Sequence, residues 1–261
     1  ALKIYKRAAP HFQKIYEIDP NNRSALVHLA QCFYFLGAND AAMSVTRELI
    51  NQEDEKPILS AEKRRTLDSL LCNTIADSNH LYHSSRGDVE RLFSLEHIDH
   101  LKLSPAATLH LKNELGIQNG AAFNSNFTEL NENELLLFLL TKSTVNDADF
   151  ENWLIQARRS LLDKYSKENT LSGCEQFASA MALHNFFNEY IYVTTTEEST
   201  LVKQLCDSFG SQPTEHALIA IGLYMPIHRV AGAKTFAENL DHKKSLSATL
   251  INLTLHDVFE E

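Results

Sequence analysis

Two histidine pairs have the spacing in this 261-residue chain that first suggests chemistry. His80 and His83 stand three positions apart, as do His97 and His100, so each pair shares one face of a helix. Zinc could bind such a pair, but no cysteine lies near either one and the sequence has no HExxH motif. Surface histidines on amphipathic helices explain both pairs more simply, so we expect no metal site.

Covalent and acid–base catalysis have equally little support. Cys32 and Cys174 have no evident base that would activate a thiol. Paired acids such as Glu197-Glu198 stand at expected helix starts, where they complement the helix dipole. The sequence also lacks the glycine-rich phosphate loops and the nucleophile elbow. We therefore expect no catalytic residue and no cofactor in this chain, and a self-contained helical enzyme is the least favoured hypothesis.

Charge and cysteine usage narrow the choice of partner and compartment. The formal net charge is −10, and the short basic runs Lys63–Arg65 and Arg158–Arg159 lie beside acids, so nucleic acid is a poor partner. Cysteines 32, 72, 174 and 206 form no CxxC motif, which favours reduced thiols in a cytoplasmic protein. The longest apolar candidate, Leu135–Leu140, is far shorter than the ~20 residues of a membrane span, so no membrane partner is expected.

The elements that would position any site are helices. Glycine (8) and proline (6) are scarce, which favours long helices over a sheet of many strands, and we expect an all-α fold. Residues 23–49 carry bulky and small residues at the places where two antiparallel helices cross, namely Leu26, Leu29-Ala30, Phe33, Leu36-Gly37, Ala42 and Leu49. A shift of 34 residues back places Ala8 on Ala42 and Ile15 on Leu49. This register resembles that of tetratricopeptide repeats; a generic helical hairpin is the alternative.

A partner-binding face follows from that resemblance. In stacked repeats the first helix of each unit lines a concave face. The residues of the complete unit that would line it are Ser24, Val27, His28, Gln31, Tyr34 and Phe35. Tyr34 would act as an aromatic anchor for an extended or helical peptide, with polar contacts around it. In the alternative, Tyr34 and Phe35 pack under the helices expected between residues 60 and 115.

Beyond residue 52 the repeat blurs, although helical spacing continues. Ser60 is expected to cap a helix that ends near Arg86-Gly87-Asp88, and Pro105 is expected at the first position of another. We predict a repeat region at residues 1–116, a linker at 117–130 that is rich in Gly, Asn and Ser, and a helical subdomain at 131–261. The chain opens without Met and ends without a stop signal, so we expect a piece of a longer protein that continues into a further domain.

An aromatic run distinguishes the second half. Residues 174–192 read as a long, mostly apolar helix, which we expect to be buried at the centre of the subdomain. Asn188 and Glu189 interrupt its aromatic faces beside Tyr190, and buried polar groups need partners. Asn188, Glu189 and Tyr190 are therefore expected to brace neighbouring helices through hydrogen bonds.

Four motifs in the second half occur in a recognisable order. They are Phe187–Tyr192, Thr195–Glu198, Tyr224–His228 and Val230–Ala233. In this order they resemble the helical region of bacterial tetratricopeptide-repeat proteins fused to a class I S-adenosylmethionine-dependent methyltransferase. The catalytic domain and its glycine-rich cofactor loop are not in this chain. The resemblance implies a non-catalytic arm that recognises a protein or peptide for a methyltransferase; the alternative is a stand-alone repeat scaffold or regulatory protein unrelated to methylation.

Overall fold

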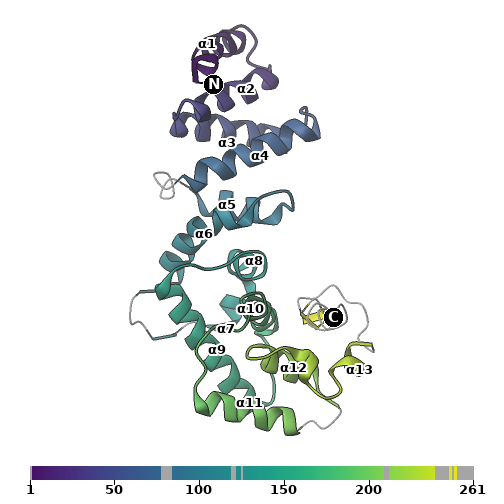
Figure 1. Cartoon of the computed structure of the whole chain (residues 1–261). Coiled ribbons are helices and arrows are strands. Elements are labelled where there is room, and N and C mark those ends of the chain that lie inside the picture. Colours follow the sequence, from purple (N-terminus) through teal and green to yellow (C-terminus); the bar gives the residue numbers. More distant parts are fainter. Residues whose placement is uncertain are drawn as a thin grey trace. The chain divides into compact units, whose positions relative to one another are not determined.

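Helices make up the regular structure of the described chain (Figure 1). The computed structural model describes residues 2–77, 84–118, 122–124, 126–208, 212–238, 247–248 and 250–251. No strand occurs within those residues, and the expected all-α class is confirmed. The chain divides into two compact units, residues 1–107 (unit 1) and 108–261 (unit 2). The division falls within one helix, α6, and the predicted linker at 117–130 includes part of another, so the predicted domain scheme stays a prediction.

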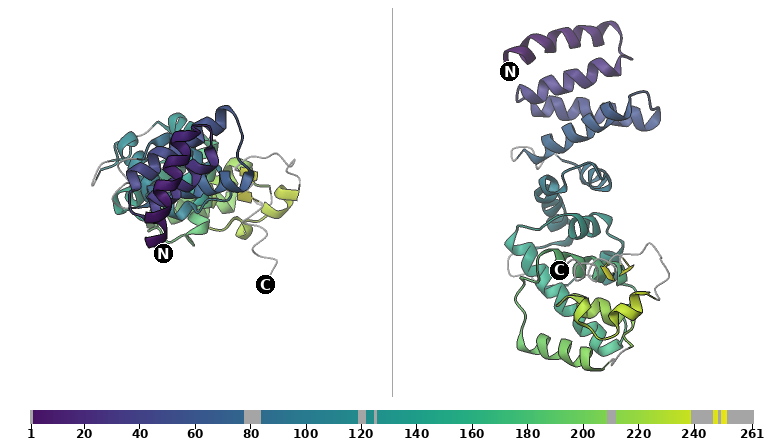
Figure 2. Two further views of the ribbon diagram at one scale, coloured as in Figure 1. Left: turned by 90° about the horizontal axis from the view of Figure 1, so that it is seen from above. Right: turned by 45° about the vertical axis from the view of Figure 1, so that its right-hand side comes forward.

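Unit 1 begins with consecutive helices that pack as antiparallel neighbours. Its elements are α1 (Leu2–Ile18), α2 (Arg23–Phe35), α3 (Asn39–Glu55), α4 (Ala61–Ala76), α5 (Arg86–Ser94) and the first half of α6 (His100–Leu115). Helix α2 packs against α1 and α3, and α3 packs against α2 and α4. Figure 2 shows these helices in successive layers. Small and bulky residues of α2 fill the interfaces, among them Leu26, Leu29 and Ala30, each at most 4% exposed.

Capping residues explain where the helices of unit 1 begin. Ser60 accepts a hydrogen bond from the Lys63 amide and starts α4, as expected. The sequence 86–88 does not break a helix, contrary to expectation. Ser85 and Asp88 form a capping box there, and this reciprocal pair of hydrogen bonds starts α5 despite Gly87 in its first turn.

The prediction that Pro105 is the first residue of a helix is also wrong. Helix α6 begins at His100, so Pro105 lies inside it rather than at its first position. The first turn of the helix therefore forms upstream of the proline, and Pro105 removes one backbone hydrogen bond from the second turn.

The turn that follows α3 is fastened by a buried carboxylate. Glu53 is 2% exposed and accepts hydrogen bonds from the amides of Ile58 and Leu59, both at 2.9 Å. Arg23 contacts the same carboxylate at 2.5 Å from the start of α2. These bonds fix the α3–α4 connection against α2. Although burial alone would raise the pKa of Glu53, the Arg23 guanidinium and the two amides lower it.

Unit 2 is arranged around α10. Its elements are α7 (Phe127–Glu132), α8 (Glu134–Lys142), α9 (Ala148–Glu168), α10 (Glu175–Phe187), α11 (Thr196–Ser208), α12 (Glu215–Gly222), the 3-10 helix η2 (Ile227–Arg229) and α13 (Ala233–Glu238), together with the second half of α6. Every residue of α10 from Phe177 to Asn185 is buried, and the helix packs against α7, α8, α9 and α12. The central buried helix is therefore confirmed, but it ends at Phe187 rather than continuing to Tyr192.

Candidate functional site

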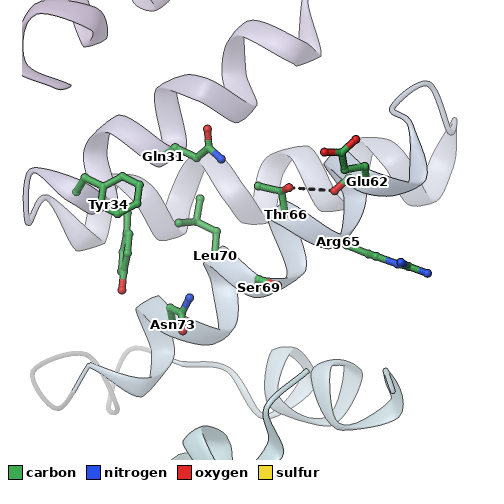
Figure 3. Close-up of a pocket in the computed structure, with 9 residues that line it drawn as sticks. Gln31, Tyr34, Glu62, Arg65, Thr66, Ser69, Leu70 and Asn73 are labelled. Carbon is green, nitrogen blue, oxygen red and sulfur yellow. Dashed lines mark hydrogen bonds between the residues drawn. The ribbon is translucent and has the colours of Figure 1, made fainter. Parts of the chain in front are cut away.

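A cavity of about 470 Å³ lies between α2 and α4 on the face where first helices of successive repeats would meet. Its lining residues are Gln31, Tyr34 and Phe35 of α2, and Glu62, Arg65, Thr66, Ser69, Leu70 and Asn73 of α4. Figure 3 shows Tyr34 and Asn73 at one end, and Glu62 and Arg65 at the other. The cavity thus has an aromatic end, an apolar floor at Leu70, and a charged end.

The two walls of the cavity are held by local hydrogen bonds. Lys63 of α4 donates to the Ser24 hydroxyl of α2 at 2.6 Å, which links the helices at one end. Thr66 donates to the carbonyl of Glu62 at 2.9 Å, so its hydroxyl is satisfied within α4 (Figure 3). The amide oxygens of Gln31 and Asn73 contact His28 and Lys102 respectively, and the amide nitrogens of both side chains can donate further hydrogen bonds.

The aromatic end extends onto α1. Phe35 stacks on Tyr5 with ring centroids 4.5 Å apart, and Tyr34 meets Phe35 edge-on at 5.4 Å. Phe35 is nevertheless 49% exposed. Three aromatic rings from two helices therefore form a continuous surface at the mouth of the cavity, the kind of surface that anchors peptide side chains.

Of the six residues predicted to bind a partner, three line this cavity: Gln31, Tyr34 and Phe35. His28 is exposed and lies one turn away, stacked on Phe12 with ring centroids 5.0 Å apart. The Ser24 hydroxyl is held by Lys63 at the edge. The prediction is wrong for Val27, which is 1% exposed because it packs inside the helical layers.

The sequence pattern missed the whole α4 wall. Helices α2 and α4 begin at Arg23 and Ala61, 38 residues apart, because the connection after α3 is longer than in a 34-residue repeat. A 34-residue register therefore cannot match the two helices. A shift of 38 residues would have paired Gln31 with Ser69 and Phe35 with Asn73, all four of which line the cavity.

A buried polar cluster in unit 2 joins α9, α11 and α12. Glu198 is 6% exposed and accepts hydrogen bonds from the Tyr224 hydroxyl at 2.8 Å and the Thr195 amide at 2.7 Å. Arg158, 1% exposed, lies 3.7 Å from this carboxylate, donates to the Val193 carbonyl at 2.6 Å, and stacks over the Tyr224 ring. Burial alone would raise the pKa of Glu198, but these hydrogen bonds and the guanidinium groups of Arg158 and Arg159 lower it.

This cluster explains two of the motifs read from the sequence. Thr195 and Glu198 form a reciprocal cap at the start of α11, so the expected helix start is confirmed. Tyr224 belongs to the turn after α12 and reaches the same carboxylate. Within unit 2 the contacts therefore have a structural role: they connect three helices through one buried charge.

The predicted brace at residues 188–190 is made largely by neighbouring residues. Asn185 donates to the Leu223 carbonyl at 2.8 Å and so links α10 to the end of α12. Asn188, the residue that caps the end of α10, contacts His184 of the last turn at 3.0 Å, so this contact does not join α10 to another helix. Glu189 is exposed, and the buried Tyr190 hydroxyl has no hydrogen-bond partner among the described residues. Glu189 and Tyr190 instead end α10 in left-handed backbone, with φ of 53° and 56°.

Residues considered for chemistry do not come together. His97 points to Asp68, at 3.4 Å, whereas His100 contacts the Leu95 carbonyl at 2.9 Å. His80 and His83 lie outside the described residues. Within the described part of the chain, no three metal-ligating side chains come together. Cys32, Cys72 and Cys174 are buried and Cys206 is partly exposed; burial raises the pKa of all four thiols, which makes them poor nucleophiles.

Comparison with protein families identifies the repeat type of the first three helices. The family described as tetratricopeptide repeat matches residues 3–61. This segment is a tetratricopeptide repeat. It covers α1 to α3 and the first residue of α4, so the cavity is formed by α2, which lies inside the matched segment, and by α4, which follows that segment. Such repeats generally mediate protein–protein interaction. Neither a curated protein nor a solved structure matches the chain. Among the described residues, no helix is both long and apolar enough to cross a bilayer.

Proposed function

We propose that this chain is a non-catalytic protein-interaction module that binds an extended or helical peptide in the cavity between α2 and α4. The cavity carries the proposal, because its α2 wall belongs to the matched repeat and its mouth presents Tyr34 and Phe35. Leu70 offers an apolar seat for a peptide side chain, and Gln31 and Asn73 offer hydrogen bonds to peptide backbone. A buried aromatic anchor with a polar surround is the usual arrangement of a binding hot spot.

Peptide selection tests this proposal directly. Peptides are selected from a random library on the whole chain, and the affinity of the best binders is then measured by fluorescence anisotropy. Tyr34→Ala should weaken binding by about 1–3 kcal/mol, or roughly 5- to 150-fold, while circular dichroism shows unchanged helicity. Ser44→Ala, on the exposed face of α3, is the matched control and should leave affinity unchanged. Selected peptides that bind both variants equally would contradict the proposal.

A photocrosslink provides a second readout. A benzophenone amino acid at Arg65 lies on the cavity wall and should capture the selected peptide. The same residue at exposed Glu48 of α3 should not. Capture at position 48 alone would place the peptide on the other face of the repeat and would overturn the site.

Which larger assembly this module serves is a separate proposal. The stand-alone repeat scaffold rests on the matched repeat alone. The recognition arm of a methyltransferase rests on the order of four motifs, no comparison supports it, and two of those motifs already have a structural role at Glu198. Calorimetry with S-adenosylmethionine separates both from an enzyme, because an interaction module should show no saturable binding. Transfer of a methyl group to the selected peptide by the isolated chain would contradict both.

A further inference from the structure

A cavity of about 580 Å³ lies in unit 2, between the end of α10 and the segment that follows α12. It joins two of the motifs read from the sequence, Phe187–Tyr192 and Tyr224–His228. Four aromatic rings and two opposite charges line it, namely Phe186, Phe187, Tyr190 and Tyr224, with Glu189 and Arg229. Its volume falls within the range of small-molecule sites, about 300–1,000 Å³.

The aromatic rings give the cavity an apolar side. Phe186 and Phe187 lie with ring centroids 5.8 Å apart and planes tilted by 57°. Phe187 is 51% exposed. The Tyr224 ring is held in place, because its hydroxyl donates to Glu198 at 2.8 Å. Rings arranged in this way favour a ligand with an apolar body, above all an aromatic one.

The backbone at Glu189 is unusual for a residue of its type. The Glu189 amide donates to the Phe186 carbonyl at 3.0 Å and the Tyr190 amide to the Asn185 carbonyl at 2.8 Å, which are the two hydrogen bonds of a Schellman cap. Glycine is the common residue at the left-handed position of this cap, but Glu189 occupies it with a φ of 53°. Its exposed side chain makes no hydrogen bond to the described residues. The cap therefore does not account for a glutamate at this place.

Arg229 brings the opposite charge to the same cavity. It is exposed, and neither Arg229 nor Glu189 forms an ion pair within the described part of the chain. The two charges thus line one cavity without neutralising each other. A guanidinium binds a carboxylate through paired N–H groups, and a carboxylate accepts hydrogen bonds from an ammonium group. A ligand that satisfies both charges carries a carboxylate and an ammonium group.

We propose that this cavity binds a free α-amino acid with an aromatic side chain. Its carboxylate would contact Arg229, its ammonium group Glu189, and its ring the aromatic side of the cavity. A free amino acid carries both charged groups on one carbon, whereas the first residue of a peptide lacks the carboxylate and the last lacks the ammonium group. The site lies in unit 2 and is independent of the proposed function.

Derivatives of one ligand test the proposal on the full chain. Calorimetry measures the affinity of L-phenylalanine, of N-acetyl-L-phenylalanine, which lacks the ammonium group, and of L-phenylalaninamide, which lacks the carboxylate. Each derivative should bind roughly tenfold more weakly than L-phenylalanine, because one hydrogen bond to a charged group is lost. L-Alanine, which has both charges and no ring, should also bind more weakly.

Two variants assign each charge to its partner. Glu189→Gln should weaken the binding of L-phenylalanine roughly tenfold and should not weaken that of N-acetyl-L-phenylalanine. Arg229→Gln should weaken L-phenylalanine by a similar factor and should not weaken L-phenylalaninamide. Glu197→Gln, at an exposed glutamate of α11, is the matched control and should leave every affinity unchanged. Circular dichroism checks that each variant keeps its helicity.

Glu189→Gly separates binding from stability. Glycine suits the left-handed position, so the urea midpoint of unit 2, followed by Trp153 fluorescence, should rise while the affinity for L-phenylalanine falls. A midpoint that does not rise would assign Glu189 to the stability of the cap and overturn its role as a ligand residue.

Other results would overturn the site itself. The first is the absence of saturable binding of L-phenylalanine, L-tyrosine and L-tryptophan at millimolar concentration. Binding of N-acetyl-L-phenylalaninamide as tight as that of L-phenylalanine would identify a peptide segment as the occupant. If both derivatives lose the same affinity in the two glutamine variants, the charges do not select the ligand. A benzophenone amino acid at position 187 that crosslinks within the chain, even in excess L-phenylalanine, would show that a segment of this protein fills the cavity.

Discussion

Replacing Glu198 with alanine should destabilise unit 2 more than any surface change on α11. The substitution removes the acceptor of the Tyr224 hydroxyl and the Thr195 amide and leaves the guanidinium of Arg158 without its carboxylate. Breaking a buried ion pair costs about 3–5 kcal/mol. Arg158 keeps the Val193 carbonyl and the Tyr224 ring, so the lower end, about 3 kcal/mol, is expected. With a urea m-value of about 2 kcal/mol/M, the midpoint should fall by about 1.5 M.

Tryptophan fluorescence measures this unit selectively. Trp153, the single tryptophan, is 4% exposed on α9 of unit 2, so its emission reports the unfolding of that unit even if unit 1 unfolds separately. Glu197→Gln is the matched control, because its side chain is exposed in the same helical turn. Tyr224→Phe should cost about 1–2 kcal/mol, and in a double-mutant cycle with Glu198→Ala the losses should not add. A Glu198→Ala midpoint equal to that of Glu197→Gln would refute this reasoning.

Three further predictions concern other buried groups. Burial lowers the pKa of His184 to about 4 in the folded protein, against about 6.5 in the unfolded chain. The stability of unit 2 should therefore be complete above about pH 6.5 and should fall as the pH drops from there towards 4, because only the unfolded chain gains a proton in that range. NMR titration should show the ring still neutral at pH 5. Asn185→Ala leaves the Leu223 carbonyl without its donor and should cost about 1–3 kcal/mol by Trp153 fluorescence; a loss below 0.5 kcal/mol, as at an ordinary surface site, would contradict the bond. Glu53→Ala should abolish hydrogen-exchange protection of the Ile58 and Leu59 amides, and retained protection would show that other acceptors hold that turn.

The fold class and the first repeat could be predicted because their signals are local. Ala42 and Leu49 of α3 recur 34 residues earlier as Ala8 and Ile15, and both helices formed where that register placed them. Helix boundaries were less predictable where two local preferences compete. At residues 85–88 the reciprocal cap of Ser85 and Asp88 outweighed the intrinsic cost of Gly87, which is roughly 1 kcal/mol.

Only one of the two walls of the candidate site could be predicted from the sequence. The α2 wall follows from the repeat, whereas the α4 wall depends on the length of the connection that Glu53 fastens. The cluster around Glu198 could not be predicted at all. Arg158 and Glu198 are far apart in the sequence, and each reads as an ordinary charge on an amphipathic helix until packing brings them together. Long-range polar contacts of this kind leave no periodic pattern in the sequence.

The different exposure of the four thiols allows a dye to be attached selectively for spectroscopy. Three of the four cysteines are sealed inside the helical packing, and only Cys206 of α11 is partly open to solvent. Although its raised pKa slows the reaction, Cys206 should react with a maleimide dye under native conditions well before the three buried thiols, so that unit 2 is modified at one position without mutagenesis. Trp153 lies in the same unit and can serve as the energy donor to that dye. Changes in the separation of α9 and α11 could then be followed in the unmodified sequence while a partner is added to unit 1.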